Sequence, residues 1–302
     1  MCYDIKASLA AQKSRAERSG DLSAAQEIEI LLRKNTTLPQ SHLNGFTHPV
    51  LGLYTSEHPE KMSLGQWGLI PHWFEGSYPE LKFNTLNARG ETMFEKAAFS
   101  QAAEQCRAIL LIDGFYEHQH RNSRIYPHFI YRQDKNPLAV ACICQRQSPG
   151  DSHNTAYAMA HKTNKTSVAL TFSIVTIKAN ALMSTIHNNP KLKEPRMPLI
   201  LDHDMQAQWL EPITERSKAF EYDPSDASNT LTLSEHFMSQ SRGIELKAHT
   251  VAPLRKKRST GLKHPNSKLE GKTLCDHGET DAAAPYHYPE LDQDWDLFSG
   301  LN

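Results

Sequence analysis

The chain begins with Met1-Cys2, a dipeptide that can supply two nucleophiles on adjacent carbon atoms. Initiator methionine is normally removed when the second residue is small, and Cys2 would then carry a free α-amine beside its thiol. The ordinary pKa values of these groups, about 8 and about 8.5, leave both partly nucleophilic near neutral pH. The amine can form an imine with an aldehyde, after which the thiol can close a five-membered thiazolidine ring. A cysteine within a chain cannot do this because its nitrogen is an amide.

Four other stretches set polar residues tightly against apolar ones. They are an aromatic segment at 67–73, Asn-Ala-Arg-Gly-Glu-Thr at 87–92, Asp-Gly-Phe-Tyr-Glu at 113–117, and an Ile-His pair at 186–187 that is followed by Arg-Met-Pro at 196–198. Taken one at a time, each has a structural explanation, since loop residues satisfy backbone groups, carboxylates at strand ends are solvated and tryptophans pack in cores. We single out as candidates Trp73, Asn87, Arg89, Glu117 and His187.

The patterns around these residues predict a mixed α+β chain. Residues 6–34 have helical spacing with a break at 19–21, which is typical of a helical hairpin. The apolar run at 107–116 predicts a buried strand that carries Glu117 at its end. Further strands are expected at 48–54, 63–70, 126–132, 138–144, 168–177, 196–201 and 244–250. Short helices are expected at 96–105, 179–186 and 202–210, and loops at 35–47 and 84–91. Because strands occur throughout, we expect one domain with a mainly antiparallel, barrel-like β core and flanking helices.

Composition narrows the function classes. With 33 basic and 34 acidic residues the net charge is −1, so no global field indicates a nucleic-acid partner, although a local basic groove remains compatible with one. The 5 cysteines are odd in number and form no Cys-x-x-Cys pair, which predicts neither a disulfide framework nor a zinc site and favours a reducing, cytoplasmic compartment. No apolar run reaches about 18 residues and no signal-peptide core is present, so we expect no membrane span.

The end of the chain differs from the rest. From about residue 256 the sequence is polar with few apolar residues, which predicts a disordered tail over 256–302. The domain is therefore expected to span 1–255, with 6–34 as a helical insertion.

Taken together, these segments resemble the SRAP family, the SOS response-associated peptidases that are also known as abasic-site processing proteins. The family pattern has Met-Cys, Trp-Gly-x-x-Pro-x-Trp, Asn-Ala-Arg-x-Glu-Thr, Asp-Gly-aromatic-aromatic-Glu, and Ile-His followed by Arg-Met-Pro, and all five occur here in that order. The resemblance implies a DNA-damage protein that binds single-stranded DNA and crosslinks Cys2 to the aldehyde of a ring-opened abasic site. It also implies a peptidase activity that removes Met1. A lyase side reaction is chemically available, because an imine beside a β-phosphate can eliminate that phosphate.

The resemblance also implies roles for the candidates. Asn87 would position the amine or the sugar, and Glu117 and His187 match the catalytic residues of the family. We expect these two to form an acid–base pair with pKa values that straddle neutrality, in which His187 helps open the sugar ring and Glu117 moves protons during imine formation and Met1 removal. We expect no metal or cofactor, and a monomer in the cytoplasm that joins the nucleoid when bound to DNA. The residues expected to bind DNA are Arg89 and Arg196, through phosphates, and Trp73, by stacking on a base.

The sequence departs from the family pattern at two places. Many members continue Met-Cys-Gly-Arg, whereas this chain has Tyr3 and Asp4, which removes one cation. Residues 189–194 are inserted between His187 and Arg196, and bring Lys191 and Lys193, which could replace that charge.

Two other functions remain open at this point. An N-terminal-nucleophile amidohydrolase of the glutamine-amidotransferase kind also exposes a cysteine after methionine removal and uses its α-amine as base. A glutaminase assay distinguishes it, and the absence of a long synthetase or isomerase half argues against it. The third hypothesis is a non-enzymatic single-strand binder in which Cys2 is incidental.

Overall fold

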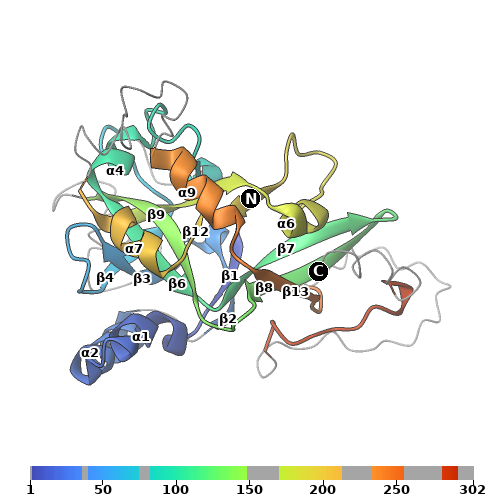
Figure 1. Ribbon diagram of the computed structural model, residues 1–302, viewed down its shortest axis with the longest axis horizontal. Coiled ribbons are helices and arrows are strands. Elements are labelled where there is room, and N and C mark those ends of the chain that lie inside the picture. The colour runs from blue at the N-terminus through green and yellow to red at the C-terminus, as the bar shows by residue number, and fades with distance from the viewer. Residues whose placement is uncertain are drawn as a thin grey trace, which may run out of the picture.

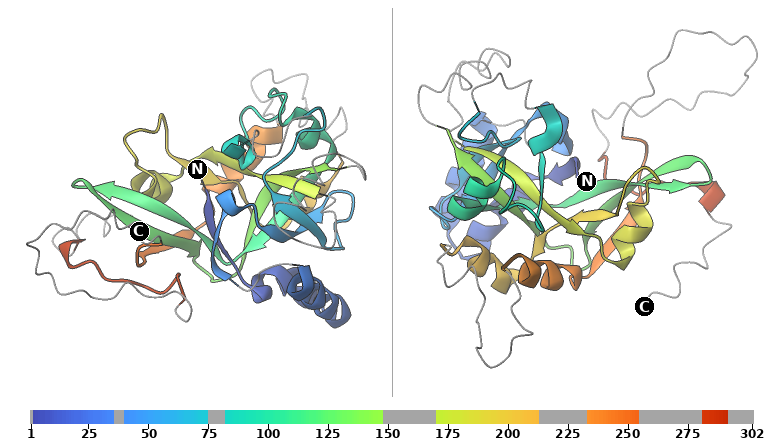
Figure 2. Two further views of the ribbon diagram at one scale, coloured as in Figure 1. Left: turned by 180° about the vertical axis from the view of Figure 1, so that it is seen from behind. Right: turned by 90° about the horizontal axis from the view of Figure 1, so that it is seen from above.

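The computed structural model describes residues 2–35, 40–74, 82–147, 170–212, 233–254 and 281–291, and the structural statements below concern these residues. Figures 1 and 2 show a β-rich body with a helical hairpin at one end and a long β-hairpin at the opposite end.

Five strands close into a barrel. β10 pairs with both β4 and β9, which closes the ring begun by the neighbours β4, β3, β6 and β9. Within the ring only the β4–β10 pair is parallel. The expectation of a mixed α+β fold with a mainly antiparallel, barrel-like core is confirmed. The barrel strands are β3 (Val50–Thr55), β4 (Ser63–Trp67), β6 (Arg107–Ile112), β9 (Leu138–Arg146) and β10 (Leu170–Lys178).

A second, fully antiparallel sheet has the order β13–β8–β7–β1–β2. β1 lies between β2 and β7, with Asp4 opposite Tyr116. This pairing brings Cys2, which precedes β1, next to the strand that carries Glu117. The strands are β1 (Asp4–Ala7), β2 (Gln40–Asn44), β7 (Gly114–Arg121), β8 (Arg124–Arg132) and β13 (Leu246–Thr250).

The predicted helical hairpin is confirmed, but its first helix begins later than residue 6. α1 (Leu9–Arg18) and α2 (Leu22–Asn35) are joined through Gly20, whose φ of 76° lies in the left-handed region that favours glycine. Residues 4–7 are strand rather than helix because two neighbouring strands pair with them. Ser8 caps α1 by accepting a hydrogen bond from the Ala11 N–H at 3.0 Å.

The other helices and short elements cover the barrel and its ends. Asp202 caps the predicted helix α7 by accepting a hydrogen bond from the Met205 N–H at 3.0 Å. One helix, α9, was not predicted. The helices are α4 (Ser100–Gln105), α6 (Ala181–Ile186), α7 (His203–Leu210) and α9 (Leu233–Arg242). The short elements are β5 (Asn87–Arg89), β11 (Arg196–Pro198), β12 (Ile200–Leu201), and 3-10 turns at Gly45–Thr47 and Lys82–Thr85.

Three predicted boundaries are wrong for one physical reason, which is pairing with distant strands. The segments 35–47 and 84–91, predicted as loops, contain β2 and β5, whose polar residues become strand because β1 and β10 offer partners. The predicted strand at 107–116 is divided at Asp113, where the chain leaves the barrel for the second sheet. Glu117 therefore lies inside β7, not at the end of a strand.

Cys106 and Cys144 form a disulfide, with their Cα atoms 5.2 Å apart. The prediction of a chain without disulfides is therefore wrong, and the inference of a reducing compartment loses this support. The spacing of 38 residues gives no hint of the pairing, which arises because β9 turns back antiparallel to β6 and places Cys144 beside the residue before β6. Among the described helices, none combines the length and apolarity needed to cross a membrane.

Part of the predicted disordered tail is ordered against the second sheet (Figure 2). Asp281 forms an ion pair with Lys6 of β1 at 2.6 Å, and Pro285 forms a β-bridge with Val251. The prediction is thus wrong for residues 281–291. The remaining tail segments, 256–280 and 292–302, lie outside the described residues.

Candidate active site at the amino terminus

Cys2 is buried where β1 meets β7. Burial raises the pKa of the Cys2 thiol well above its usual range, and the negative charge of Glu117 raises it further. The thiol is therefore protonated at neutral pH in this form of the chain. An amine on the same residue would be the better first nucleophile, with the thiol reacting after a base has taken its proton.

Glu117 and His187 face each other across this site. The Oε2 atom of Glu117 lies 3.8 Å from Nε2 of His187, which is too long for a direct hydrogen bond. Burial raises the pKa of Glu117 to about 7, although the positive charge of the amino terminus and a 3.1 Å hydrogen bond from the His118 N–H oppose this. Burial lowers the pKa of His187 to about 4, and the positive charge of the amino terminus lowers it further.

These pKa values are in the reverse of the ordinary order for a carboxyl group and an imidazole. Glu117, at about 7, retains its proton more strongly than His187, at about 4. At neutral pH His187 is thus a neutral imidazole, and Glu117 is divided between its acid and its base form. A carboxyl group poised in this way can both accept and donate a proton.

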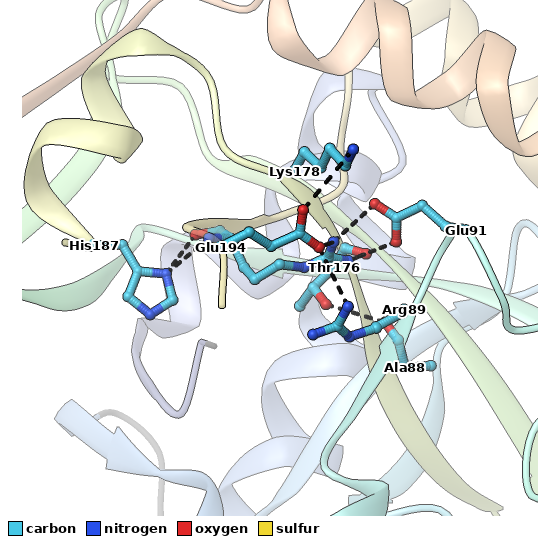
Figure 3. A network of polar contacts seen from close by, with 8 residues as sticks. Ala88, Arg89, Glu91, Thr176, Lys178, His187 and Glu194 are labelled. Carbon is cyan, nitrogen blue, oxygen red and sulfur yellow. Dashed lines mark hydrogen bonds and ion pairs between the residues drawn. The ribbon is translucent and has the colours of Figure 1, made fainter. Parts of the chain in front are cut away.

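The ring of His187 is held by the backbone of Arg196. Its Nδ1 atom lies 2.8 Å from the Arg196 carbonyl oxygen and 3.0 Å from the Arg196 amide nitrogen, so it donates or accepts according to the tautomer (Figure 3). In both tautomers Nε2 points towards Glu117. His187 itself lies at the carboxyl end of α6, where its N–H donates to the Met183 carbonyl at 2.7 Å.

Asn87 is a buried amide on β5 whose Oδ1 and Nδ2 atoms both lack a hydrogen-bond partner among the described residues. Leaving such groups unpaired costs about 1–3 kcal/mol each, so a buried amide of this kind takes its partner from a water molecule or a ligand. Asn87 and Arg89 are two residues apart on one strand and therefore lie on the same face. The amide is available for a polar group of a ligand, beside the cationic side chain of Arg89.

Arg196 does not reach the surface. Its side chain is only 2% exposed, and its two terminal nitrogens lie 2.8 and 2.7 Å from the carboxylate oxygens of Glu91. Nη2 also donates to the Thr176 carbonyl at 2.7 Å. Although burial acts against it, hydrogen bonding from Arg196 keeps the pKa of Glu91 below its usual range. The guanidinium is thus engaged in an internal ion pair, and the contact of Arg196 with a DNA phosphate stays a prediction that requires this pair to open.

Replacing Arg196 by methionine should therefore destabilise the fold by about 3 kcal/mol, since Glu91 would keep a partly buried charge without its partner. Urea unfolding measures this change. The double variant Arg196→Met/Glu91→Gln should lose less than the sum of the two single variants. A variant that keeps its unfolding free energy but loses affinity for undamaged single-stranded DNA would restore the direct-contact role.

Trp73 and Asp4 differ sharply in exposure. Trp73 is half-exposed and its indole N–H donates to the Ala97 carbonyl at 3.0 Å, which leaves a ring face open on the surface. None of its described contacts involves the catalytic candidates. Asp4 is buried and accepts hydrogen bonds from His42 at 2.7 Å and Asn44 at 2.5 Å. This arrangement was not predicted, because the segment that contains β2 was expected to be a loop.

No group of three or more His, Cys, Asp or Glu side chains in the described part of the chain could hold a metal ion. Two residues of the network in Figure 3 were not predicted from the sequence, Lys178 and Glu194. The carboxylate of Glu194 forms ion pairs with Lys178 and Arg196. Neither Lys178 nor Glu194 belongs to a recognisable motif, and both are ordinary surface residue types.

Comparison with known proteins shows which family and which fold this chain resembles. The family model described as SOS response associated peptidase (SRAP) matches residues 1–236. The abasic site processing protein HMCES of Xenopus tropicalis is 30% identical over 166 residues, which are 48% of this chain and 44% of that protein. The abasic site processing protein YoaM of Bacillus subtilis is 28% identical over 164 residues, 54% and 62% of the two chains. The chain thus spans about half the length of the curated relatives it matches. A solved protein from Bacteroides thetaiotaomicron, 24% identical, has the same fold with a TM-score of 0.61, covering 83% of this chain and 92% of that one.

Proposed function

The chain belongs to the SOS response associated peptidase (SRAP) family, and from this premise we propose that it captures abasic sites in single-stranded DNA through Cys2. The partner would be the ring-opened sugar, which presents an aldehyde. The protein would act as a monomer in the cytoplasm. The names of the relatives HMCES and YoaM, both abasic site processing proteins, support this choice of substrate.

The chemistry begins with removal of Met1, which we attribute to the protein's own peptidase activity. The freed α-amine of Cys2 adds to the aldehyde carbon, and the resulting carbinolamine loses water to give an imine. The thiol then adds to the imine carbon while the nitrogen takes up a proton, which closes a thiazolidine. One water is released overall. Ring closure removes the imine, and so competes with elimination of the neighbouring phosphate, the lyase reaction.

The acid–base steps fall to Glu117 and His187. With a pKa raised to about 7 by burial, Glu117 accepts a proton from the attacking amine and returns it to the departing hydroxyl. It then accepts the proton of the Cys2 thiol. His187, neutral at this pH, exchanges protons with the sugar hydroxyls as the ring opens. Asn87 offers its unpaired amide to the sugar.

Binding is assigned to two surface groups. Arg89 holds a phosphate, for which its planar fork is suited, and the exposed face of Trp73 stacks on an unpaired base, which is worth about 1–3 kcal/mol per base. The observation that carries the proposal is the meeting of Cys2, Glu117 and His187 at one buried site, although they are far apart in the sequence.

Intact mass spectrometry after incubation with an abasic single-stranded oligonucleotide tests the proposal. We expect a species without Met1 that is heavier by the oligonucleotide less one water, and no such species with undamaged DNA of the same sequence. Unmodified protein after loss of Met1, under conditions where the DNA retains its abasic site, would contradict the proposed function.

A further inference from the structure

Glu194 lies at the centre of a cationic cluster beside the candidate active site (Figure 3). Its carboxylate oxygens are 3.2 Å from Nη1 of Arg89, 3.1 Å from Nη1 of Arg196 and 3.9 Å from Nζ of Lys178. Three cations thus converge on one carboxylate. Glu194 is the last residue of the segment 189–194, which is inserted relative to the family pattern.

Sheet pairing explains why the three cations meet. Arg89 of β5 is opposite Thr176 of β10, and Lys178 follows two residues later on the same face of β10. Lys178 is in turn opposite Arg196 of β11. One cation therefore comes from each of three neighbouring strands. The cluster is also attached to the catalytic site, because the backbone of Arg196 holds His187.

The three cations are not equally available. Arg196 is buried and already paired with Glu91, so it would remain neutralised if Glu194 moved away. The side chains of Arg89 and Lys178 are 50% and 63% exposed, and Glu194 is their only carboxylate partner within the described residues. The side chain of Glu194 is itself 31% exposed, so it can leave without opening the core.

A carboxylate held between an arginine and a lysine occupies the place that suits a phosphate. Both anions accept hydrogen bonds from the arginine fork, and both gain from the neighbouring ammonium group. We propose that Arg89 and Lys178 form a subsite for one phosphodiester of the DNA strand, and that Glu194 occupies this subsite in the free protein. This inference rests on the proposed function and adds to it a further DNA contact, Lys178, and a competing group, Glu194.

The consequence is that DNA must displace Glu194 before its phosphate can bind. Binding is weakened because Glu194 must give up its three ion pairs, two of them with the partly exposed side chains of Arg89 and Lys178. The inserted segment would therefore lower the affinity for any single strand, damaged or intact, without touching the reacting atoms.

The test measures binding of an undamaged single-stranded oligonucleotide, which cannot form the crosslink. Glu194→Gln should bind about three- to tenfold more tightly than the wild type at low salt, because the two cations no longer have a competing anion. Lys178→Gln should weaken binding much more in the Glu194→Gln background than in the wild type. In that background it should also reduce the slope of log K against log salt by about 0.7, the value for one phosphate contact on a single strand.

Glu57→Gln is the matched control, since it makes the same charge change at an exposed carboxylate that pairs with Arg146 instead. It should leave the affinity unchanged. Equal affinity of Glu194→Gln and the wild type, an equal effect of Lys178→Gln in both backgrounds, or no DNA binding by any variant would each overturn the inference. Failure of the proposed function appears elsewhere, as the absence of an adduct with abasic DNA, so the two failures are distinguishable.

Discussion

Replacing Cys2 by alanine should abolish the stable adduct with abasic DNA and leave the affinity for undamaged single strands unchanged within about twofold. The comparison uses Cys2→Ala protein whose loss of Met1 has been verified by intact mass, so that its α-amine is free to form an imine. Without the thiol the thiazolidine cannot close, and the imine hydrolyses on denaturation. Binding of intact DNA uses phosphate and stacking contacts that do not involve the thiol. Denaturing electrophoresis measures the adduct, and fluorescence anisotropy measures the affinity.

The same variant should redirect the reaction. An imine that is not trapped by the thiol persists long enough to eliminate the neighbouring phosphate, so Cys2→Ala should cleave more abasic DNA than the wild type. Borohydride should convert its imine to a stable adduct. Cys142→Ala provides the matched control, because Cys142 is also a free, buried cysteine and should retain full crosslinking. A Cys2→Ala protein that still retains abasic DNA through denaturing electrophoresis without borohydride would refute the thiazolidine mechanism.

Replacing Glu117 by glutamine should slow adduct formation by about 10²- to 10⁴-fold, the usual contribution of a positioned acid–base group. Glutamine keeps the shape and polarity of the side chain but cannot exchange protons. Quenched-flow sampling of the adduct measures the rate. Loss of Glu117 should also remove the dependence of that rate on a group with a pKa near 7, the value to which burial raises this carboxyl.

The same substitution should make the folded protein more stable at high pH. Below pH 4.5 the carboxyl is protonated in both the folded and the unfolded state and carries no penalty. As the pH rises above 4.5 the unfolded state ionises first, and above about 7 the folded state must also hold a buried charge, so stability is lost over this window. A shift from 4.5 to about 7 corresponds to about 3 kcal/mol at pH 8.

Urea unfolding at pH 5 and pH 8 measures this gain, and Glu57→Gln again serves as a control with little expected change.

His187 changes the pH dependence of stability in the opposite direction. Burial lowers its pKa from 6.5 to about 4, so the stability that depends on the neutral ring is lost as the pH falls through that window. Because the two contributions oppose each other in the wild type, the diagnostic comparison is with the variant, and equal stability of Glu117→Gln and the wild type at pH 8 would show that Glu117 is not desolvated as the structure indicates.

Much of the fold follows from local sequence patterns. The apolar runs that became β6, β9 and β10 are buried on both faces and could be recognised without knowledge of their partners. The helical hairpin and the capped helix α7 were likewise evident from helical spacing, a glycine break and an aspartate cap. These features depend on residues close together in the chain, which is the range over which sequence periodicity carries information.

The sequence by itself also determined the chemical inventory: a cysteine after the initiator methionine, together with Asn87, Glu117 and His187 in motifs that identify the family. The burial and the protonation states of these residues were decided only by the tertiary structure. Glu117 has a pKa near 7 because burial removes it from water, and β1, which flanks β7 on one side, is distant from it in the sequence. Desolvation depends on everything that surrounds a group, so it cannot be read from the motif that contains it.

The same limit applies to charge pairing. Arg196 lies in a family motif, but the partner that withdraws it from the surface, Glu91, is 105 residues away. The carboxylate of Glu194 meets Arg89 over the same distance in sequence, because β5 and β11 both pair with the barrel strand β10. The sequence therefore determined which reactive groups the protein has, whereas long-range strand pairing decided which of them are buried, which are neutral and which are already occupied.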